Sequence, residues 1–179
     1  MPGNPTKKTD KKNKVILVKM KIKDAIEKAK EKEGIKEILK NGGFFCSGFI
    51  TLKSDEKIER WNLSFYNPET GNITSVLVSE NSVETGVTDK PLHKKVYNPD
   101  ESKIKVDSQE ALEKAKREFE SYGKPLVKIL ISFQKKEKEF WNISFITKVG
   151  SIVNIRIDSQ TGETIKKEEI NLFQKYKAA

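Results

Sequence analysis

The sequence contains few of the side chains on which most enzyme chemistry depends. In 179 residues there is one cysteine, Cys46, and one histidine, His93. A single cysteine excludes an internal disulfide and is typical of a reducing cytosol. Two such residues cannot supply the ligands of a zinc site, and no Gly-rich phosphate loop of the Walker or dinucleotide kind is present. We therefore expect no metal and no cofactor.

Long apolar runs are missing as well. The apolar stretch nearest the start, VILV at residues 15–18, is far shorter than a signal-peptide core of about 7–15 residues or a membrane span of about 20. This predicts a soluble protein without a membrane span. We expect it in the cytoplasm, or outside the cytoplasm if the printed chain lacks its native N-terminus.

Positive charge is unevenly distributed along the chain. The net charge is +9, and residues 1–14 account for +4 of it, with five lysines against Asp10. Closely spaced lysines bind phosphates through charge alone. The candidate contacts for an anion or a nucleic acid are therefore Lys7, Lys8, Lys11, Lys12 and Lys14. The competing interpretation is a disordered, solubilising tail, and the absence of aromatic residues from it argues against sequence-specific reading of bases.

Two short sequence words occur twice, in the same order. AIEKAK at residues 25–30 returns as ALEKAK at 111–116, and RWNLSF at 60–65 returns as FWNISF at 140–145. The offsets are 86 and 80 residues, so the first copy has about six extra residues between the two words. The chain is therefore predicted to be a tandem repeat.

Each copy is expected to begin with a helix. In the second copy, Ser108 is the predicted N-cap, an apolar stripe runs from Ala111 to Tyr122 at helical spacing, and Gly123 with Pro125 ends the helix. In the first copy, the stripe from Ile22 to Ala29 predicts a shorter helix that is broken at Gly34. One further turn is expected before the double glycine at residues 42–43.

Strands are expected after each helix. The predicted strands of the second copy span residues 126–133, a segment around Trp141, a segment around Ile155, and 164–172, and those of the first copy span 45–52, 58–66 and 73–78. Side chains alternate along a strand. Hence one face of the middle strand presents the tryptophan and the other presents Asn and Ser. The large side chains assigned to the core are Trp61, Phe65, Trp141 and Phe145.

This order of elements, with tryptophan in a middle strand and a closing Asp-x-x-Thr-Gly turn, resembles the PepSY family. The second copy matches better, because its turn reads Asp158 to Gly162, whereas in the first copy Val78 is followed by SENSVETG at residues 79–86, without the Asp. The resemblance implies a non-catalytic binding or regulatory module, proposed to inhibit or chaperone peptidases. The expected fold is α+β, with two consecutive helix-on-antiparallel-sheet repeats. A basic tail at residues 1–14 would precede repeats at 15–96 and 97–179, which would be joined through residues 87–105.

Three classes of function remain open from the sequence. The leading hypothesis is a non-enzymatic module that binds a protein or peptide through a sheet edge or the surface between the repeats. The second is a basic nucleic-acid- or ribosome-associated protein that uses the lysine tail. An enzyme is third, because a catalytic Cys46–His93 pair requires the fold to bring a predicted strand and the connection between repeats together.

Overall fold

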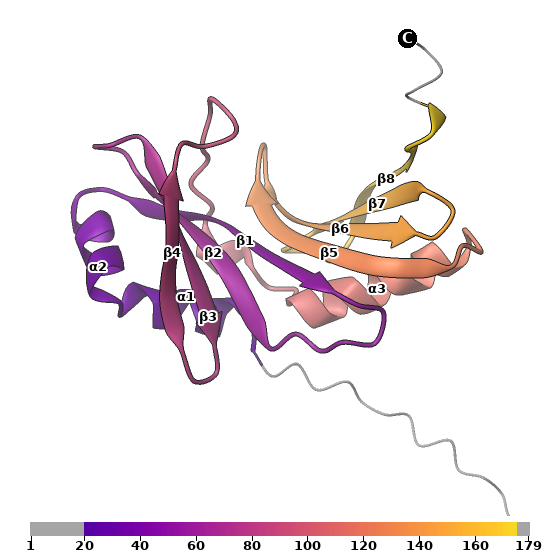
Figure 1. The fold of residues 1–179 in the computed structure, drawn as a ribbon, viewed down its shortest axis with the longest axis horizontal. Helices are drawn as coiled ribbons and strands as arrows, with labels where there is room; N and C mark the ends of the chain where they lie inside the picture. The colour runs from indigo at the N-terminus through magenta and orange to yellow at the C-terminus, as the bar shows by residue number, and fades with distance from the viewer. Residues whose placement is uncertain (1–19, 175–179) are drawn as a thin grey trace, which may run out of the picture.

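The computed structural model describes residues 20–174, which form helices and strands in two similar successions (Figure 1). In chain order the elements are α1 (Ile22–Lys30), α2 (Glu33–Lys40), β1 (Phe44–Leu52), β2 (Arg60–Asn67), β3 (Asn72–Ser79), β4 (Val83–Asp89), the 3-10 helix η1 (Glu101–Lys103), α3 (Ser108–Glu120), β5 (Leu126–Lys135), β6 (Glu139–Thr147), β7 (Ser151–Asp158) and β8 (Thr164–Asn171).

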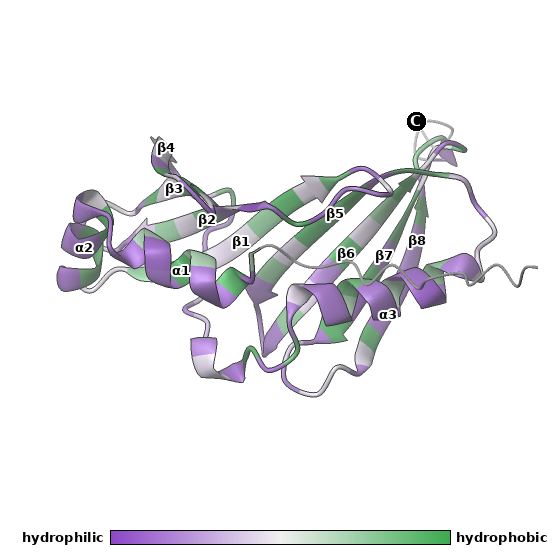
Figure 2. Ribbon diagram, turned by 90° about the horizontal axis from the view of Figure 1, so that it is seen from below, coloured by the Kyte–Doolittle hydropathy of each residue, from purple (hydrophilic) through white to green (hydrophobic). Residues whose placement is uncertain are grey.

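The strands of both repeats belong to one antiparallel sheet. Its order is β4-β3-β2-β1-β5-β6-β7-β8, so each repeat is a meander and the first strands of the two repeats pair with each other. The three α-helices lie on the same face of this sheet (Figure 2). The prediction of an α+β fold with two helix-on-sheet repeats is confirmed, and the opposite face, here called the open face, has no helix among the described residues.

Alternation along the strands builds the core between the helices and the sheet. Trp61, Leu63 and Phe65 of β2 are fully buried, as are Trp141, Ile143 and Phe145 of β6. The residues between them, Asn and Ser, lie on the open face. Buried residues of both repeats form a single apolar cluster. Such continuity means that neither repeat closes a core of its own.

The two tryptophans occupy equivalent environments. The indole Nε1–H of Trp61 donates to the carbonyl oxygen of Met20 at 3.1 Å, and that of Trp141 donates to Val106 at 2.9 Å. Met20 and Val106 each lie two residues before the first residue of a helix, and they are separated by the same 86 residues as the repeated helix words. The duplication therefore extends to the hydrogen bonds that fix the segments before α1 and α3 to the sheet.

The tryptophans also meet across the boundary between the repeats. Their ring centroids lie 5.9 Å apart, although β1 and β5 run between the strands that hold them. Gly48 of β1 leaves space at this boundary, because a Cβ there would lie 2.6 Å from the Cδ1 atom of Ile22. The first helix thus packs directly on the strand that joins the two meanders, which makes the boundary part of the core.

Two local predictions for the helices are wrong. The N-cap of α3 is Asp107, not Ser108, because the Asp107 carboxylate accepts hydrogen bonds from the N–H groups of Gln109 and Glu110 at 2.9 and 3.0 Å. The first helix ends at Lys30, before Gly34, which lies inside the first turn of α2. A second helix therefore takes the place of the single further turn.

The connection between the repeats is shorter than expected at its start. β4 extends to Asp89, so the segment that leaves the sheet begins at Lys90 rather than at Val87. β4 has no buried residue. For that reason it gives no alternating pattern in the sequence.

The closing turns of the two repeats use different side chains for one task. The carboxylate of Asp158 accepts from the N–H groups of Gln160 and Thr161, at 2.8 and 3.1 Å. At the equivalent point of the first repeat, the hydroxyl of Ser79 accepts from the N–H of Ser82 at 3.1 Å. In the first repeat, Ser79 thus takes the place of the missing Asp and stabilises the turn. In the second repeat, the carboxylate of Asp158 has the same structural role.

Among residues 20–174, none of the helices has the length and apolar character needed to cross a membrane.

Candidate peptide-binding surface at the junction of the repeats

The open face is hollowed where the two repeats meet. The hollow has a volume of about 710 Å³, and we call it the junction hollow. Its floor comes from strands of both repeats, and its wall comes from the end of β4 and the connection that follows. The floor residues are Cys46, Ser47, Gly48, Phe49, Ser64, Ile73, Ser75, Leu130, Ser132, Gln134, Asn142 and Ser144.

The twelve floor residues carry no charge in a chain of which 34% is charged, but two charged residues at strand ends, Asp89 of β4 and Lys135 of β5, also line the hollow. The polar groups of the floor are hydroxyls and amides placed opposite one another on neighbouring strands, such as Ser47 opposite Ser64 and Ser132 opposite Asn142. These side chains are the outward half of the alternating strands. A surface of this kind can donate and accept hydrogen bonds without a large desolvation cost.

Exposed apolar side chains gather at the same place. Of the eight large hydrophobic residues that are exposed in the described part of the chain, three line the junction hollow: Phe49, Val87 and Leu92, with exposed fractions of 42, 72 and 99%. They come from β1, β4 and the connection. Apolar side chains that converge from separate elements mark an interaction site more strongly than scattered ones do.

A buried carboxylate helps to hold the connection against the sheet. Glu139 of β6 has 2% of its side chain exposed and accepts a hydrogen bond from the N–H of Asp100 at 2.9 Å. Its carboxylate also lies 3.3 Å from Lys135 Nζ, which in turn donates to the carbonyl oxygen of Asn98 at 3.1 Å. Burial raises the pKa of Glu139, but the Asp100 hydrogen bond and Lys135 outweigh burial and hold it below its usual value.

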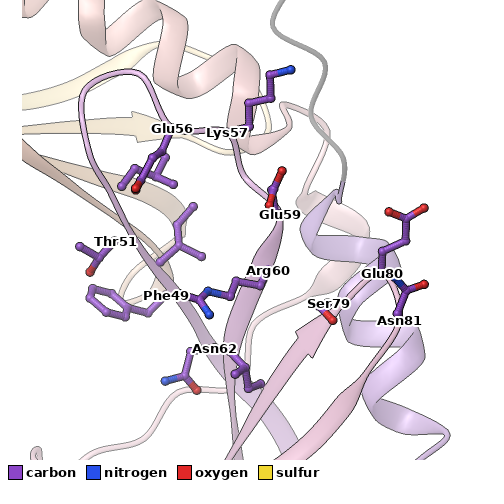
Figure 3. Close-up of a pocket in the computed structure, with 13 residues that line it drawn as sticks. Phe49, Thr51, Glu56, Lys57, Glu59, Arg60, Asn62, Ser79, Glu80 and Asn81 are labelled. Atoms are coloured by element: carbon purple, nitrogen blue, oxygen red, sulfur yellow. The ribbon is translucent and has the colours of Figure 1, made fainter.

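A second hollow lies at the other end of β1 and β2, where these strands part (Figure 3). Their last paired residues are Phe49 and Asn62, and the following loop turns Ile58 into the core. This hollow measures about 950 Å³ and is lined by five charged residues: Glu56, Lys57, Glu59, Arg60 and Glu80. Phe49 borders both hollows. Because the charged lining of the second hollow is well solvated, this hollow is the weaker candidate for an apolar ligand.

The structure brings the only cysteine and the only histidine into the same hollow. Cys46 and His93 both line it, yet no hydrogen bond joins them. Cys46 is 8% exposed, and its thiol donates to the carbonyl oxygen of Ser64 at 3.3 Å. Burial raises the pKa of the Cys46 thiol to about 11. At neutral pH the group is a protonated thiol, which is a poor nucleophile.

The remaining residues singled out from the sequence are the lysines of the basic tail and the aromatic residues assigned to the core. The lysines of the basic tail, Lys7, Lys8, Lys11, Lys12 and Lys14, lie outside the described residues. Trp61, Phe65, Trp141 and Phe145 are each 0% exposed. Sequence reasoning missed Phe49, Val87 and Leu92. The one sequence feature that could have indicated the hollow is Leu130, an apolar residue at a position of β5 where alternation predicts a polar one. It lies half-buried in the floor.

Comparison with known proteins shows a relative in fold. The chain is similar to the crystal structure of a "putative lipoprotein" from Clostridium difficile 630, with a TM-score of 0.57 and 16% sequence identity. The match covers 86% of this chain and 95% of that one. No protein-family model and no curated protein matches the sequence. Identity at this level shows the fold alone.

Proposed function

We propose that the chain is a non-enzymatic, tandem PepSY-like module that binds a peptide or protein segment in the junction hollow. The observation that supports this is the convergence of three exposed apolar side chains on an uncharged floor shared by both repeats. A binding site at the boundary of two structural units is a common arrangement. A peptidase-inhibitor-like role is the specific form suggested by the PepSY resemblance.

The proposal assigns the binding site to the junction hollow and not to a free edge of the sheet. The β8 edge has four charged residues among eight, Lys166, Lys167, Glu168 and Glu169, and charges on an edge strand oppose pairing with another chain. The β4 edge has only two charged residues among seven. The β4 edge borders the junction hollow through Val87 and Asp89. A segment bound in the hollow would therefore lie nearer to the β4 edge than to the β8 edge.

The alternative is a basic protein that binds nucleic acid through its lysine tail. Eight of the 35 lysines and arginines and one of the 26 acidic residues lie outside the described part, which leaves residues 20–174 with a net charge of +2. A nearly neutral segment of this kind gives little attraction for a phosphate backbone. The protein-binding proposal is therefore preferred.

A site-specific photo-crosslinker distinguishes the two. A benzophenone amino acid at position 130, in the floor, is expected to capture a polypeptide from a lysate of the source organism both before and after nuclease treatment. The matched control is position 152, which also presents a half-buried apolar residue on the open face, outside the hollow. Equal capture from both positions, or capture that disappears with nuclease, would refute the proposal.

The compartment is a separate proposal. The lone cysteine favours the cytoplasm, whereas the likeness in fold to a protein described as a lipoprotein favours the extracytoplasmic alternative. Fractionation of the source cells with an antibody to the chain decides between them, because only one fraction should contain the protein.

A further inference from the structure

We infer that the partner segment is extended and places a large apolar side chain next to a carboxylate. This inference rests on the proposed function and specifies the ligand of the same hollow. Three features of the hollow define the ligand: where its apolar side chains stand, which charges on its rim are unpaired, and how the polar groups of its floor are arranged.

The apolar side chain follows from the exposed residues of the wall and floor. Leu92 is 99% exposed and Val87 is 72% exposed. Burying apolar surface on binding is favourable roughly in proportion to the area removed from water. Apolar side chains of a bound segment that pack on Phe49, Val87 or Leu92 would therefore remove this surface from water, which polar side chains cannot match.

The carboxylate follows from the charges on the rim. Three lysines line the hollow against one acid, Asp89. Of these lysines, Lys135 already pairs with Glu139. Lys90 and Lys95 form no ion pair within the described residues, and Lys95 Nζ stands 4.6 Å from the centroid of the Tyr97 ring. Lys90 lies two residues before Leu92 in the chain, so an anion attracted to it would lie beside the apolar contact.

The extended backbone follows from the floor. Its hydroxyls and amides repeat from strand to strand, as in the row formed by Ser75, Ser64 and Ser47. A fatty acid also combines an apolar chain with a carboxylate. The hydroxyl of Ser75 already donates to the carbonyl oxygen of Val87, and that of Ser132 already accepts from Gln134, but the Ser64 hydroxyl forms no hydrogen bond among the described residues. An alkyl chain would cover this hydroxyl and leave it unpaired, whereas a backbone N–H or C=O group of a peptide satisfies it.

The test begins with a selection from a display library of random nonapeptides on the immobilised full chain. We expect enriched peptides to place Leu, Ile, Phe or Met within two residues of Asp, Glu or the C-terminal carboxylate. Failure to enrich any peptide would refute the proposed function itself. Enrichment of peptides that lack an acid would overturn only the inference about ligand chemistry.

Titration of one selected peptide against variants, followed by fluorescence anisotropy, completes the test. Lys90→Glu combined with Lys95→Glu is expected to weaken binding at least tenfold, and Val87→Ser to weaken it several-fold. Lys148→Glu, an exposed lysine in the β6–β7 turn away from the hollow, is the matched control and should leave the affinity unchanged. Equal affinity for the Lys90/Lys95 variant and the wild type, or displacement of the peptide by submicellar laurate at the peptide's own concentration, would overturn the inference.

Discussion

Replacing the two buried tryptophans tests whether the repeats share one core. Trp61→Leu and Trp141→Leu each remove a fully buried indole and its hydrogen bond to the chain before a helix. Large-to-small changes in a core, with the loss of one buried hydrogen bond, cost about 2–4 kcal/mol. A domain of typical stability, about 5–15 kcal/mol, tolerates either change alone.

The double variant gives the interaction free energy between the two tryptophans, which decides whether the repeats share one core. Because the rings lie 5.9 Å apart, the first substitution already removes their mutual contact. The cost of the double change should fall short of the sum of the single costs by about 0.5–1.5 kcal/mol. Urea unfolding followed by far-UV circular dichroism measures all four proteins, and a single transition is expected in each.

A second pair of substitutions serves as the control. Val76→Ala in β3 and Val153→Ala in β7 also change one fully buried residue in each repeat, but four strands run between them. Their costs should add within about 0.5 kcal/mol. If the tryptophan pair is equally additive, or if the two halves unfold in separate transitions, the shared core is refuted.

Three further predictions concern single groups. Cys46, with its pKa raised to about 11, should react with iodoacetamide at pH 8 at least about 100-fold faster after unfolding, and rapid labelling of the native protein would contradict its burial. The lowered pKa of Glu139 adds stability that is present above the unfolded-state pKa of about 4.3 and is lost as the pH falls through the lower folded-state value. Urea unfolding of the wild type and of Glu139→Gln should therefore give a difference in unfolding free energy of about 1.5–3 kcal/mol at pH 7, and this difference should shrink toward pH 3. A difference that stays constant with pH would contradict the assignment. Asp158→Ala should cost about 1–2 kcal/mol and Ser79→Ala less, because a carboxylate caps its turn more strongly than a hydroxyl, and thermal melts giving the reverse order would contradict that account.

The parts of the fold that the sequence predicted are those that follow from repetition and alternation. The recurring tryptophan strand identifies β2 and β6 and the face of each that is buried, since a period of two leaves one choice of face. β4 could not be found this way. It lies at the edge of the sheet with no buried residue, and a strand without an apolar face has no periodic signal.

The candidate site depends on contacts between residues that are distant in the sequence. The outward Ser and Asn positions of its floor were predictable from alternation, but the wall depends on where the connection runs. That path depends on hydrogen bonds between distant residues, such as those from Asp100 N–H to Glu139, 39 residues away, and from Lys105 N–H to the carbonyl oxygen of Ser159. Glutamate is rarely buried, so nothing in the local sequence around Glu139 marks it as the anchor.

A crystal structure of the chain with a selected peptide tests the central claim most directly. The account predicts an extended peptide on the open face at the boundary between β1 and β5, with an apolar side chain against Phe49 and a carboxylate near Lys90 or Lys95. A peptide paired along the outer edge of β8, or bound on the face that the helices cover, would contradict it.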